Sequence, residues 1–348
     1  MSAFALYRLP HEQHFTMVEQ TSGMPLELSS LSELNGRRGF VVAPFAVTDS
    51  EPLLLIRGDR VEQHLLTDRL ELQCELGQDE GDNSSRETYS IDFANYHAHL
   101  VSGDFQKIVL ARSAKVPLQA SQHVYDLFLD ACRCYPRMFV CLVSTKRSRT
   151  WLTATPEILL SSAAGNWQTI ALAGTMQLEG DDLNSEGEHV TWGIKNIQEQ
   201  RYVATYITEC LERFAEDFTE RGPYTVRAGN LVHLRSDFTF TLPDTLHLGD
   251  VLMTLHPTPA VCGLPKRQTF DFIRKNEHTP RHYYSGFMGP LQLPATHLYV
   301  SLRCMQLLAD GYRLYAGGGL LPDSTEEQEW QETEAKMETM RSLLVHNS

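Results

Sequence analysis

The stretch from Tyr315 to Lys336, YAGGGLLPDSTEEQEWQETEAK, restricts the possible folds of this chain more than any other stretch. A short apolar run ends on three consecutive glycines, Gly317–Gly319, which allow another group to come very close to the backbone. A turn follows, and then a predicted helix in which Glu329, Glu332 and Lys336 are spaced i, i+3 and i+7. This spacing places the three charged side chains on one face of the helix.

The same helix face continues to Met340 and Leu343, which are apolar and are expected to point into the protein. The charged groups at the start of the helix would then also point inward, where an unpaired charge is unfavourable. A hard cation such as Mg²⁺, bound by carboxylates and by substrate oxygens, would remove this cost. The alternative is a solvated acidic helix whose glutamates pair with lysines, and this stretch alone leaves both interpretations open.

Composition excludes several classes of partner. The chain has 348 residues, 42% of them hydrophobic, which suffices for a large core, and its formal net charge of −14 disfavours nucleic acid or an anionic membrane as a partner. The first residues lack the basic and apolar segments of a signal peptide, and no apolar run is long enough to span a bilayer. Seven scattered cysteines form no disulfide pattern. We therefore expect a cytoplasmic protein with reduced cysteines, and a monomer because no heptad seam is present.

The pattern of apolar residues predicts an α+β protein with two large, mostly antiparallel β-sheets flanked by helices. Residues 78–86 are polar and aperiodic, which indicates a loop. A long helix is predicted over residues 186–217, and Glu199 lies on its buried face one turn before Val203. The other predicted helices are residues 89–102, a segment from residue 124 that Pro136 ends, and short segments near residues 250 and 270. The predicted strands are residues 107–113, 137–144, 150–162, 167–175, 231–236, 297–308 and 312–319.

Several charged or flexible residues stand beside these apolar runs. Lys107 begins the apolar strand KIVLAR, where desolvation favours a neutral amine that can act as a base. Glu157 follows Pro156 at the start of a strand, and a partly desolvated carboxyl there suits general-acid chemistry. Arg303 lies within the apolar run VSLRC and could pair with a ligand carboxylate. Each residue also has an ordinary structural explanation, so none is specific alone.

Taken together and in order, the motifs KIVLAR, ATPE, LAGT, LVHL, LHPTPA, LRC, AGGG and EWQETEAK resemble the chorismate-utilising enzymes, which include isochorismate, salicylate, anthranilate and aminodeoxychorismate synthases. The resemblance covers residues 105–345, whereas residues 1–104 are less typical. It implies a single chorismate-binding domain, residues 1–348, with Mg²⁺ and chorismate in a central cleft. It also implies that the partner is a small molecule and not nucleic acid or a membrane.

The resemblance assigns a role to each motif residue. Lys107 and Glu157 would be catalytic, Tyr284 and Arg303 would face the enolpyruvyl carboxylate, and His233 would lie beside the ring. The other implied contacts with substrate are Gly174, Thr175, Ala260, Gly317 and Lys336, together with Arg303, and the implied metal ligands are Glu199, Glu332 and, directly or through water, Glu329.

Two positions favour water as the nucleophile. Members of the family that add water have a lysine at the position of Lys107, and many aminodeoxychorismate synthases have a nucleophilic lysine where this chain has Ala173. The resemblance therefore implies an isochorismate synthase, in which water adds at C2 and the C4 hydroxyl leaves. Salicylate synthase is the alternative, and anthranilate or aminodeoxychorismate synthase fits less well.

A non-catalytic chorismate-binding protein is a further alternative. Residues 176–179 replace a segment that often contains arginine, Cys262 stands where glycine or serine is commoner, and Ile194 and Ile197 replace polar residues near Glu199. None of these departures falls on an implied catalytic or metal-binding position.

Overall fold

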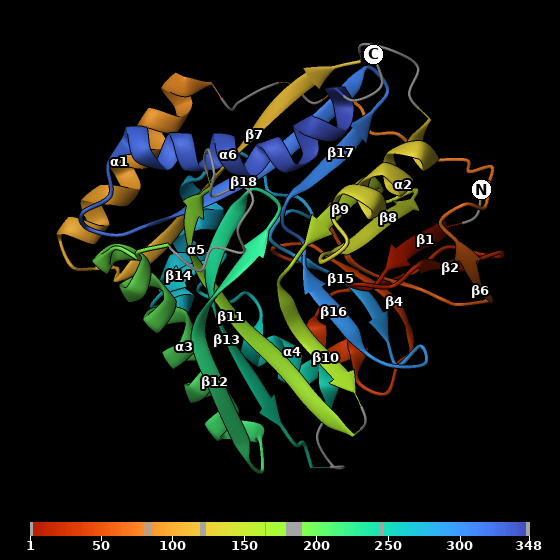
Figure 1. Ribbon diagram of the computed structural model, residues 1–348, viewed down its shortest axis with the longest axis horizontal. Coiled ribbons are helices and arrows are strands. Elements are labelled where there is room, and N and C mark those ends of the chain that lie inside the picture. Colours follow the sequence, from red (N-terminus) through yellow and green to blue (C-terminus); the bar gives the residue numbers. More distant parts are fainter. Residues whose placement is uncertain are drawn as a thin grey trace.

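Two nine-stranded sheets form the centre of the molecule (Figure 1). The structure is a computed structural model and describes residues 3–79, 81, 85–118, 123–163, 165–178, 190–243 and 247–345. Every pair of neighbouring strands in both sheets is antiparallel. The prediction of an α+β fold with two large antiparallel sheets is therefore confirmed.

The first sheet, sheet A, contains in spatial order β14 (Gly263–Leu264), β7 (Lys107–Pro117), β18 (Gly311–Leu320), β17 (Cys304–Leu308), β9 (Arg149–Thr155), β8 (Phe139–Thr145), β1 (Ala3–Arg8), β2 (His14–Gln20) and β6 (Arg60–Leu65). The second sheet, sheet B, contains β12 (Phe218–Ala228), β13 (Leu231–Phe240), β11 (Asn166–Gln177), β10 (Ile158–Ala163), β16 (His297–Val300), β15 (Phe287–Leu291), β4 (Gly39–Ala43), β5 (Leu53–Ile56) and β3 (Leu26–Leu28). Strands from the first 65 residues thus extend both sheets.

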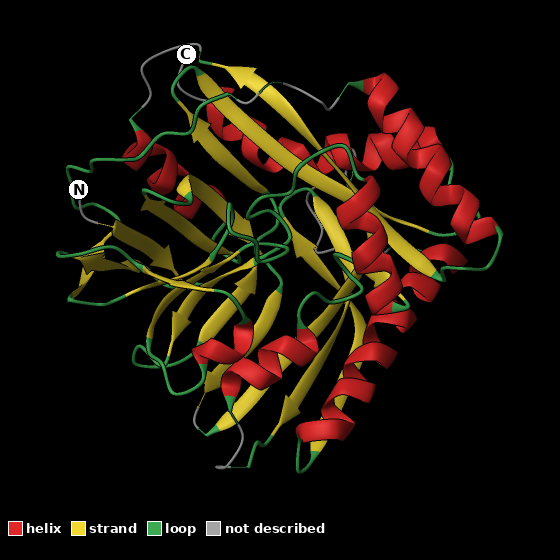
Figure 2. Cartoon of the chain, turned by 180° about the vertical axis from the view of Figure 1, so that it is seen from behind, coloured by secondary structure: helices red, strands yellow, loops and turns green. Residues whose placement is uncertain are grey.

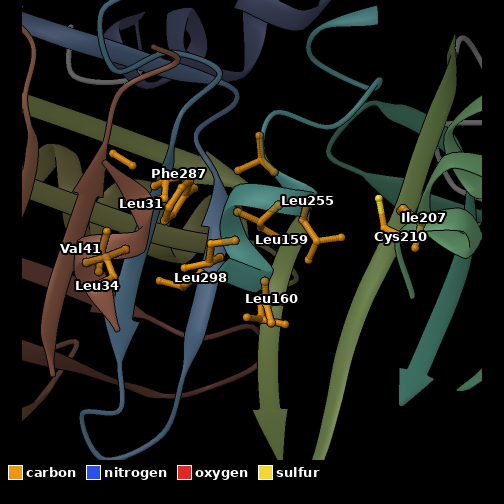
Figure 3. Close-up of a cluster of buried hydrophobic side chains, with 14 of the residues drawn as sticks. Leu31, Leu34, Val41, Leu159, Leu160, Ile207, Cys210, Leu255, Phe287 and Leu298 are labelled. Carbon is orange, nitrogen blue, oxygen red and sulfur yellow. The ribbon is translucent and has the colours of Figure 1, made fainter. Parts of the chain in front are cut away.

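Helices cover the sheets and shield their apolar faces (Figure 2). They are η1 (Leu31–Leu34), α1 (Arg86–Val101), α2 (Val124–Cys134), α3 (Ile194–Phe214), α4 (Leu248–Leu255), α5 (Lys266–Asn276) and α6 (Glu326–Val345). Side chains of α2 and α6 pack against sheet A, and those of η1, α3 and α4 pack against sheet B. Figure 3 shows part of the core between sheet B and its helices, where Leu255 of α4 lies near Leu159 of β10 and Phe287 of β15. Aromatic and aliphatic residues of both sheets fill the space between them.

The chain passes from one sheet to the other at two places that the sequence predicted as continuous strands. Residues 150–162 form β9 in sheet A and β10 in sheet B, and residues 297–308 form β16 in sheet B and β17 in sheet A. The prediction of one strand in each segment was wrong. Glu157 lies in the first crossover and Arg303 in the second, where Arg303 has a φ of 47°. The crossovers bind one another, because Val300 N donates to Glu157 O at 2.9 Å and Ala154 N donates to Arg303 O at 3.1 Å.

Two further expectations need correction. The long helix begins at Ile194, and residues 190–193 are not helical, while residues 186–189 of the prediction lie outside the described residues. The sequence pattern also missed β12, because its middle residues are mostly exposed and polar and give no apolar alternation. The helix after residue 326 was predicted correctly, with Met340 and Leu343 buried.

Within the described part of the chain, no helix combines the length and apolar composition needed to cross a membrane.

Candidate active site

A cavity lies where the two crossovers meet β11, β18 and the helices α3 and α6. Ten of the thirteen residues implied by the resemblance line it: Glu157, Gly174, Thr175, Glu199, His233, Ala260, Tyr284, Arg303, Gly317 and Lys336. Val109, Leu172 and Leu302 add an apolar part to the lining. Lys107, Glu329 and Glu332 are not in the lining but contact residues close to it.

A β-bulge at Gly174 turns the backbone of the LAGT motif toward the cavity. The pairing between β11 and β13 shifts register between Ala173 and Thr175, and Gly174 has a φ of 68°, which favours glycine. Its N–H donates to Glu199 Oε2 at 3.1 Å, and its carbonyl oxygen lies 3.0 Å from His233 Nδ1. The bulge therefore uses one residue's backbone to orient two side chains of the site.

His233 orients Arg303. Nδ1 of His233 donates to the Gly174 carbonyl, and Nε2 accepts from Arg303 Nη2 at 2.5 Å, so the two bonds define a neutral imidazole. Burial, followed by the charges of Arg303 and Lys336, holds the pKa of His233 well below its usual value. A neutral His233 can accept from Arg303 without repelling it, and the guanidinium remains directed at the cavity.

Glu157 is buried in the cavity wall. Burial raises the pKa of Glu157 to about 8, although the positive charges of Lys107, Arg303 and Lys336 oppose that rise. The carboxyl therefore carries a proton at neutral pH. A protonated carboxyl facing a cavity can act as a proton donor.

Lys107 reaches the cavity edge from β7 and pairs with Glu199. Its Nζ lies 2.9 Å from Glu199 Oε1, and its side chain is fully buried. Burial would raise the pKa of Glu199, but Lys107 and more distant lysines reverse the direction and hold it below the usual value. A Cβ added to Gly319 would lie 2.2 Å from Glu199 Oε1 and 2.9 Å from Lys107 Cε. The third glycine of the AGGG motif is thus required so that this ion pair can lie against β18.

Glu329 and Glu332 on α6 also pair with lysines. Lys195 forms an ion pair with Glu329, whose Oε1 also accepts from Ser324 Oγ at 2.7 Å. Lys336 lies 2.6 Å from Glu332 Oε1 and donates to the Gly317 carbonyl at 2.9 Å. Burial and the nearby Glu332 raise the pKa of Glu329 to about 7. The pairing with lysines agrees with the alternative interpretation, but its solvated helix does not, because Glu329 is buried.

The sequence analysis did not identify Lys195. Burial lowers the pKa of Lys195, but Glu329, together with Glu332 and Glu199, outweighs burial, and the net direction is upward. Its ammonium group therefore lies in the combined field of the three glutamates. The available signal was its position four residues before Glu199, which places both side chains on one face of α3.

The donor chemistry of this region fits Mg²⁺. Among the described residues, no three His, Cys, Asp or Glu side chains already lie together as a metal cluster. Glu199, Glu329 and Glu332 nevertheless all raise the pKa of Lys195, and Glu329 Oε2 is buried without a hydrogen-bond partner. Carboxylate oxygens are the protein ligands that Mg²⁺ prefers.

Arg281 and Glu277 support the wall of the cavity, and sequence reasoning missed both. Arg281 binds both carboxylate oxygens of Glu277, at 2.5 and 2.7 Å, and the two side chains are only 4% and 3% exposed. It also donates to the carbonyls of Val109 and Val261, each at 2.7 Å. Both valines line the cavity, so this ion pair fixes two of its walls.

Comparison with known proteins identifies the class to which this site belongs. The family model described as "Chorismate binding enzyme" matches residues 55–345. The chain belongs to this family. The match begins fifty residues before the motifs on which the sequence resemblance was based.

Two curated relatives have similar sequences. "Isochorismate synthase MenF" of Escherichia coli K12 is 29% identical over 250 residues, which cover 70% of this chain and 57% of the relative. "Salicylate biosynthesis isochorismate synthase" of Pseudomonas aeruginosa is 32% identical over 252 residues, which cover 70% of this chain and 51% of the relative. The chain therefore spans little more than half the length of these relatives.

The fold is also found in a solved structure. The menaquinone-specific isochorismate synthase MenF from Escherichia coli superimposes with a TM-score of 0.80 at 22% identity, over 98% of this chain and 88% of that chain. At this identity the likeness establishes the fold.

The protonation of Glu157 gives a test based on stability. The folded state keeps this proton up to about pH 8, whereas the unfolded state loses it near pH 4.5. Rising pH between these values should therefore destabilise the native protein, by at most about 5 kcal/mol. We expect the free energy of unfolding to fall with pH more steeply in the wild type than in Glu157→Gln, measured by urea titration from about pH 5 to 8.

Glu338→Gln is the matched control, because Glu338 has an exposed side chain (52%) on α6. Its pH profile should parallel the wild type. If the free energy of unfolding of Glu157→Gln also had the same pH dependence as that of the wild type, Glu157 would be ionised in the native state.

Proposed function

We propose that this chain converts chorismate to isochorismate in an Mg²⁺-dependent reaction. The observation that carries the proposal is the placement of Glu157, protonated at neutral pH, in one cavity with Arg303, Lys336 and the bulged Gly174. Family membership and the printed names of both curated relatives support the same activity. Salicylate, formed by further elimination of pyruvate, is the second candidate product. The name of the Pseudomonas aeruginosa relative, "Salicylate biosynthesis isochorismate synthase", is the reason to test for this second product.

Chorismate is a dianion, and the cationic groups of the cavity would hold it although the protein has a net charge of −14. We infer that Arg303 and Tyr284 bind the enolpyruvyl carboxylate and that His233 lies beside the ring. Arg303 remains a cation, since burial lowers its pKa only to about 10. The other proposed contacts are Gly174, Thr175, Ala260, Gly317 and Lys336.

In the proposed reaction, water adds to C2 of the ring and the C4 hydroxyl leaves as water. Lys107 takes a proton from the attacking water, and Glu157 gives its proton to the departing hydroxyl. The two ring double bonds shift from C1=C2 and C5=C6 to C1=C6 and C4=C5, so substrate and product are isomers. The proton gained by Lys107 and the one lost by Glu157 must be exchanged before the next turnover.

We propose Glu199 and Glu332 as Mg²⁺ ligands, with Glu329 acting directly or through water. Bound there, the ion would supply positive charge to the ring carboxylate of chorismate. In the structure, Lys107, Lys195 and Lys336 each lie within ion-pair distance of one of these carboxylates.

Water is the proposed nucleophile rather than ammonia. Ala173 lines the cavity where many aminodeoxychorismate synthases have a nucleophilic lysine, and Lys107 is present at the edge of the cavity. None of the departures from the family pattern falls on a proposed catalytic or metal-binding residue. Cys262 is buried, Ile194 and Ile197 are exposed on α3, and of residues 176–179 the last lies outside the described residues. We therefore favour an active enzyme over a non-catalytic binding protein.

We infer that residues 1–348 act as one chorismate-binding unit, with residues 1–104 completing both sheets around the core of residues 105–345.

All seven cysteines are unpaired, which supports a reducing compartment such as the cytoplasm. A monomer remains the expectation from the sequence.

Product analysis tests the proposed function. Purified protein incubated with chorismate and Mg²⁺ should yield isochorismate, separated by liquid chromatography. Salicylate as the main product would favour the second candidate. Tight binding of chorismate without any product would support a non-catalytic protein.

The catalytic assignments predict that Lys107→Ala and Glu157→Gln each lower kcat by at least about a hundredfold, the usual size of a general acid or base contribution. Chorismate binding, measured by calorimetry, should remain largely intact because neither group is a proposed substrate anchor. Lys115→Ala is the control, since Lys115 is also on β7 but pairs with Asp79 and Asp310 away from the cavity. Near wild-type kcat in either variant would refute the role assigned to that residue.

The metal assignments predict that Glu199→Gln and Glu332→Gln each weaken Mg²⁺ binding by at least about tenfold, because a charged ligand is replaced by a neutral one. Titration calorimetry with Mg²⁺, with and without chorismate, measures this independently of activity. Glu338→Gln should bind Mg²⁺ as the wild type does. Unchanged affinity in both ligand variants would exclude this site.

A further inference from the structure

A second cavity lies beside the first one, separated from it by Trp151 and Tyr315. Within the described part of the chain, its lining comes from the β8–β9 hairpin, from β7, β17 and β18, and from loop residues 50, 51, 78, 81, 280, 282 and 283. No residue that lines it also lines the first cavity. The proposed function leaves this cavity without a role.

The lining is cationic. It contains Arg147, Arg149 and Arg313 but a single carboxylate, that of Glu51, and Glu51 is already paired with His282. The protein as a whole has a net charge of −14, so a lining with more arginines than carboxylates has the opposite charge balance. A guanidinium group presents a planar set of donors that matches a carboxylate.

The carboxylates that pair with these arginines do not occupy the cavity. Arg147 pairs with Glu27, Arg149 lies 3.8 Å from Glu75, and Arg313 pairs with Asp79. Among the described residues, these three acids are outside the cavity lining. These ion pairs therefore restrain the arginine side chains without entering the cavity, as a preorganised anion site requires.

Part of the site is fixed, although Arg147 and Arg149 are partly exposed. The side chain of Arg313 is nine-tenths buried, with 10% exposed, and Nη2 donates to the Gly81 carbonyl at 2.8 Å. Arg149 and His282 both hold a left-handed backbone, with φ of 63° and 50°, which is unfavourable for residues with a Cβ. Such conformations persist where the surrounding structure imposes them, and they concentrate at functional sites.

The floor of the cavity is aromatic. Trp151 and Tyr283 are buried, with ring centroids 6.0 Å apart, and Nε1 of Trp151 donates to the Ser148 carbonyl at 2.8 Å. Two aromatic rings below a set of arginines suit a flat ring that carries carboxylate groups.

The same aromatic residues connect the two cavities. The ring of Trp151 lies 5.3 Å from that of Tyr315, and Tyr315 stacks on Tyr284 at 5.7 Å. Tyr315 and Tyr284 line the chorismate cavity, whereas Trp151 and Tyr283 line the second cavity. A ligand that shifts Trp151 or Tyr283 would therefore move the wall of the chorismate cavity.

We propose that the second cavity binds a small aromatic carboxylate and that its occupancy changes the affinity of the protein for chorismate. This anion site is separate from the chorismate cavity, and its existence does not depend on the reaction proposed above. The coupling is reciprocal, so chorismate changes the affinity for the second ligand by the same factor.

Titration calorimetry with phthalate as the probe, at constant ionic strength, tests the site. We expect the wild type to bind phthalate and the double variant Arg147→Gln/Arg149→Gln to bind it at least about tenfold more weakly, because charged hydrogen bonds are lost. Both side chains are partly exposed, and a thermal melt reports whether the double variant folds. Arg133→Gln, on the exposed face of α2, is the matched control and should bind as the wild type does.

A variant of the first cavity separates the two sites. Lys336→Met should lose affinity for chorismate and keep its affinity for phthalate. In wild-type kinetics, phthalate should change the apparent affinity for chorismate up to a plateau, as expected for two sites. The proposal is overturned if the wild type does not bind phthalate at millimolar concentration, if the double variant binds it equally well, or if phthalate competes with chorismate without a plateau.

Discussion

The site depends on three lysine–glutamate ion pairs beside the glycines of β18, in which each lysine compensates the charge of a carboxylate. Each proposed metal ligand pairs with a lysine from a different element: Lys107 on β7, Lys195 on α3 and Lys336 on α6. Removing one member of such a pair would leave an isolated charge, which is far less favourable than the intact pair. The pairs therefore connect a strand of sheet A with the two helices that close the cavity.

The two segments in which the chain crosses from one sheet to the other provide further residues of the site. Glu157 and Arg303 are in the segments where the chain leaves one sheet for the other, and the backbones of these segments bind each other. A regular strand would alternate these side chains between two packed faces. At a crossover they instead turn toward the cavity, while burial keeps the carboxyl of Glu157 protonated.

Local patterns were sufficient to predict much of this molecule. Spacing on α6 predicted the shared face of Glu329, Glu332 and Lys336, and the order of short motifs predicted ten residues that line one cavity. The crossovers could not be predicted, because an apolar run looks the same whether or not it changes sheets. Arg281 and Glu277 were missed for a related reason, since the backbone carbonyls they organise lie far away in sequence.

The pairing of β18 with β7 has a consequence for synthesis of the protein. These strands pair along almost their whole length, from Gly311 opposite Pro117 to Leu320 opposite Ile108. During translation, β7 leaves the ribosome long before β18 and α6, and a domain generally folds as a unit. Until then, β7 has an unpaired edge that can bind other strands, and Lys107 lacks its glycine neighbour. A nascent chain of this protein is therefore most exposed to aggregation, and most in need of a chaperone, immediately before its active site forms.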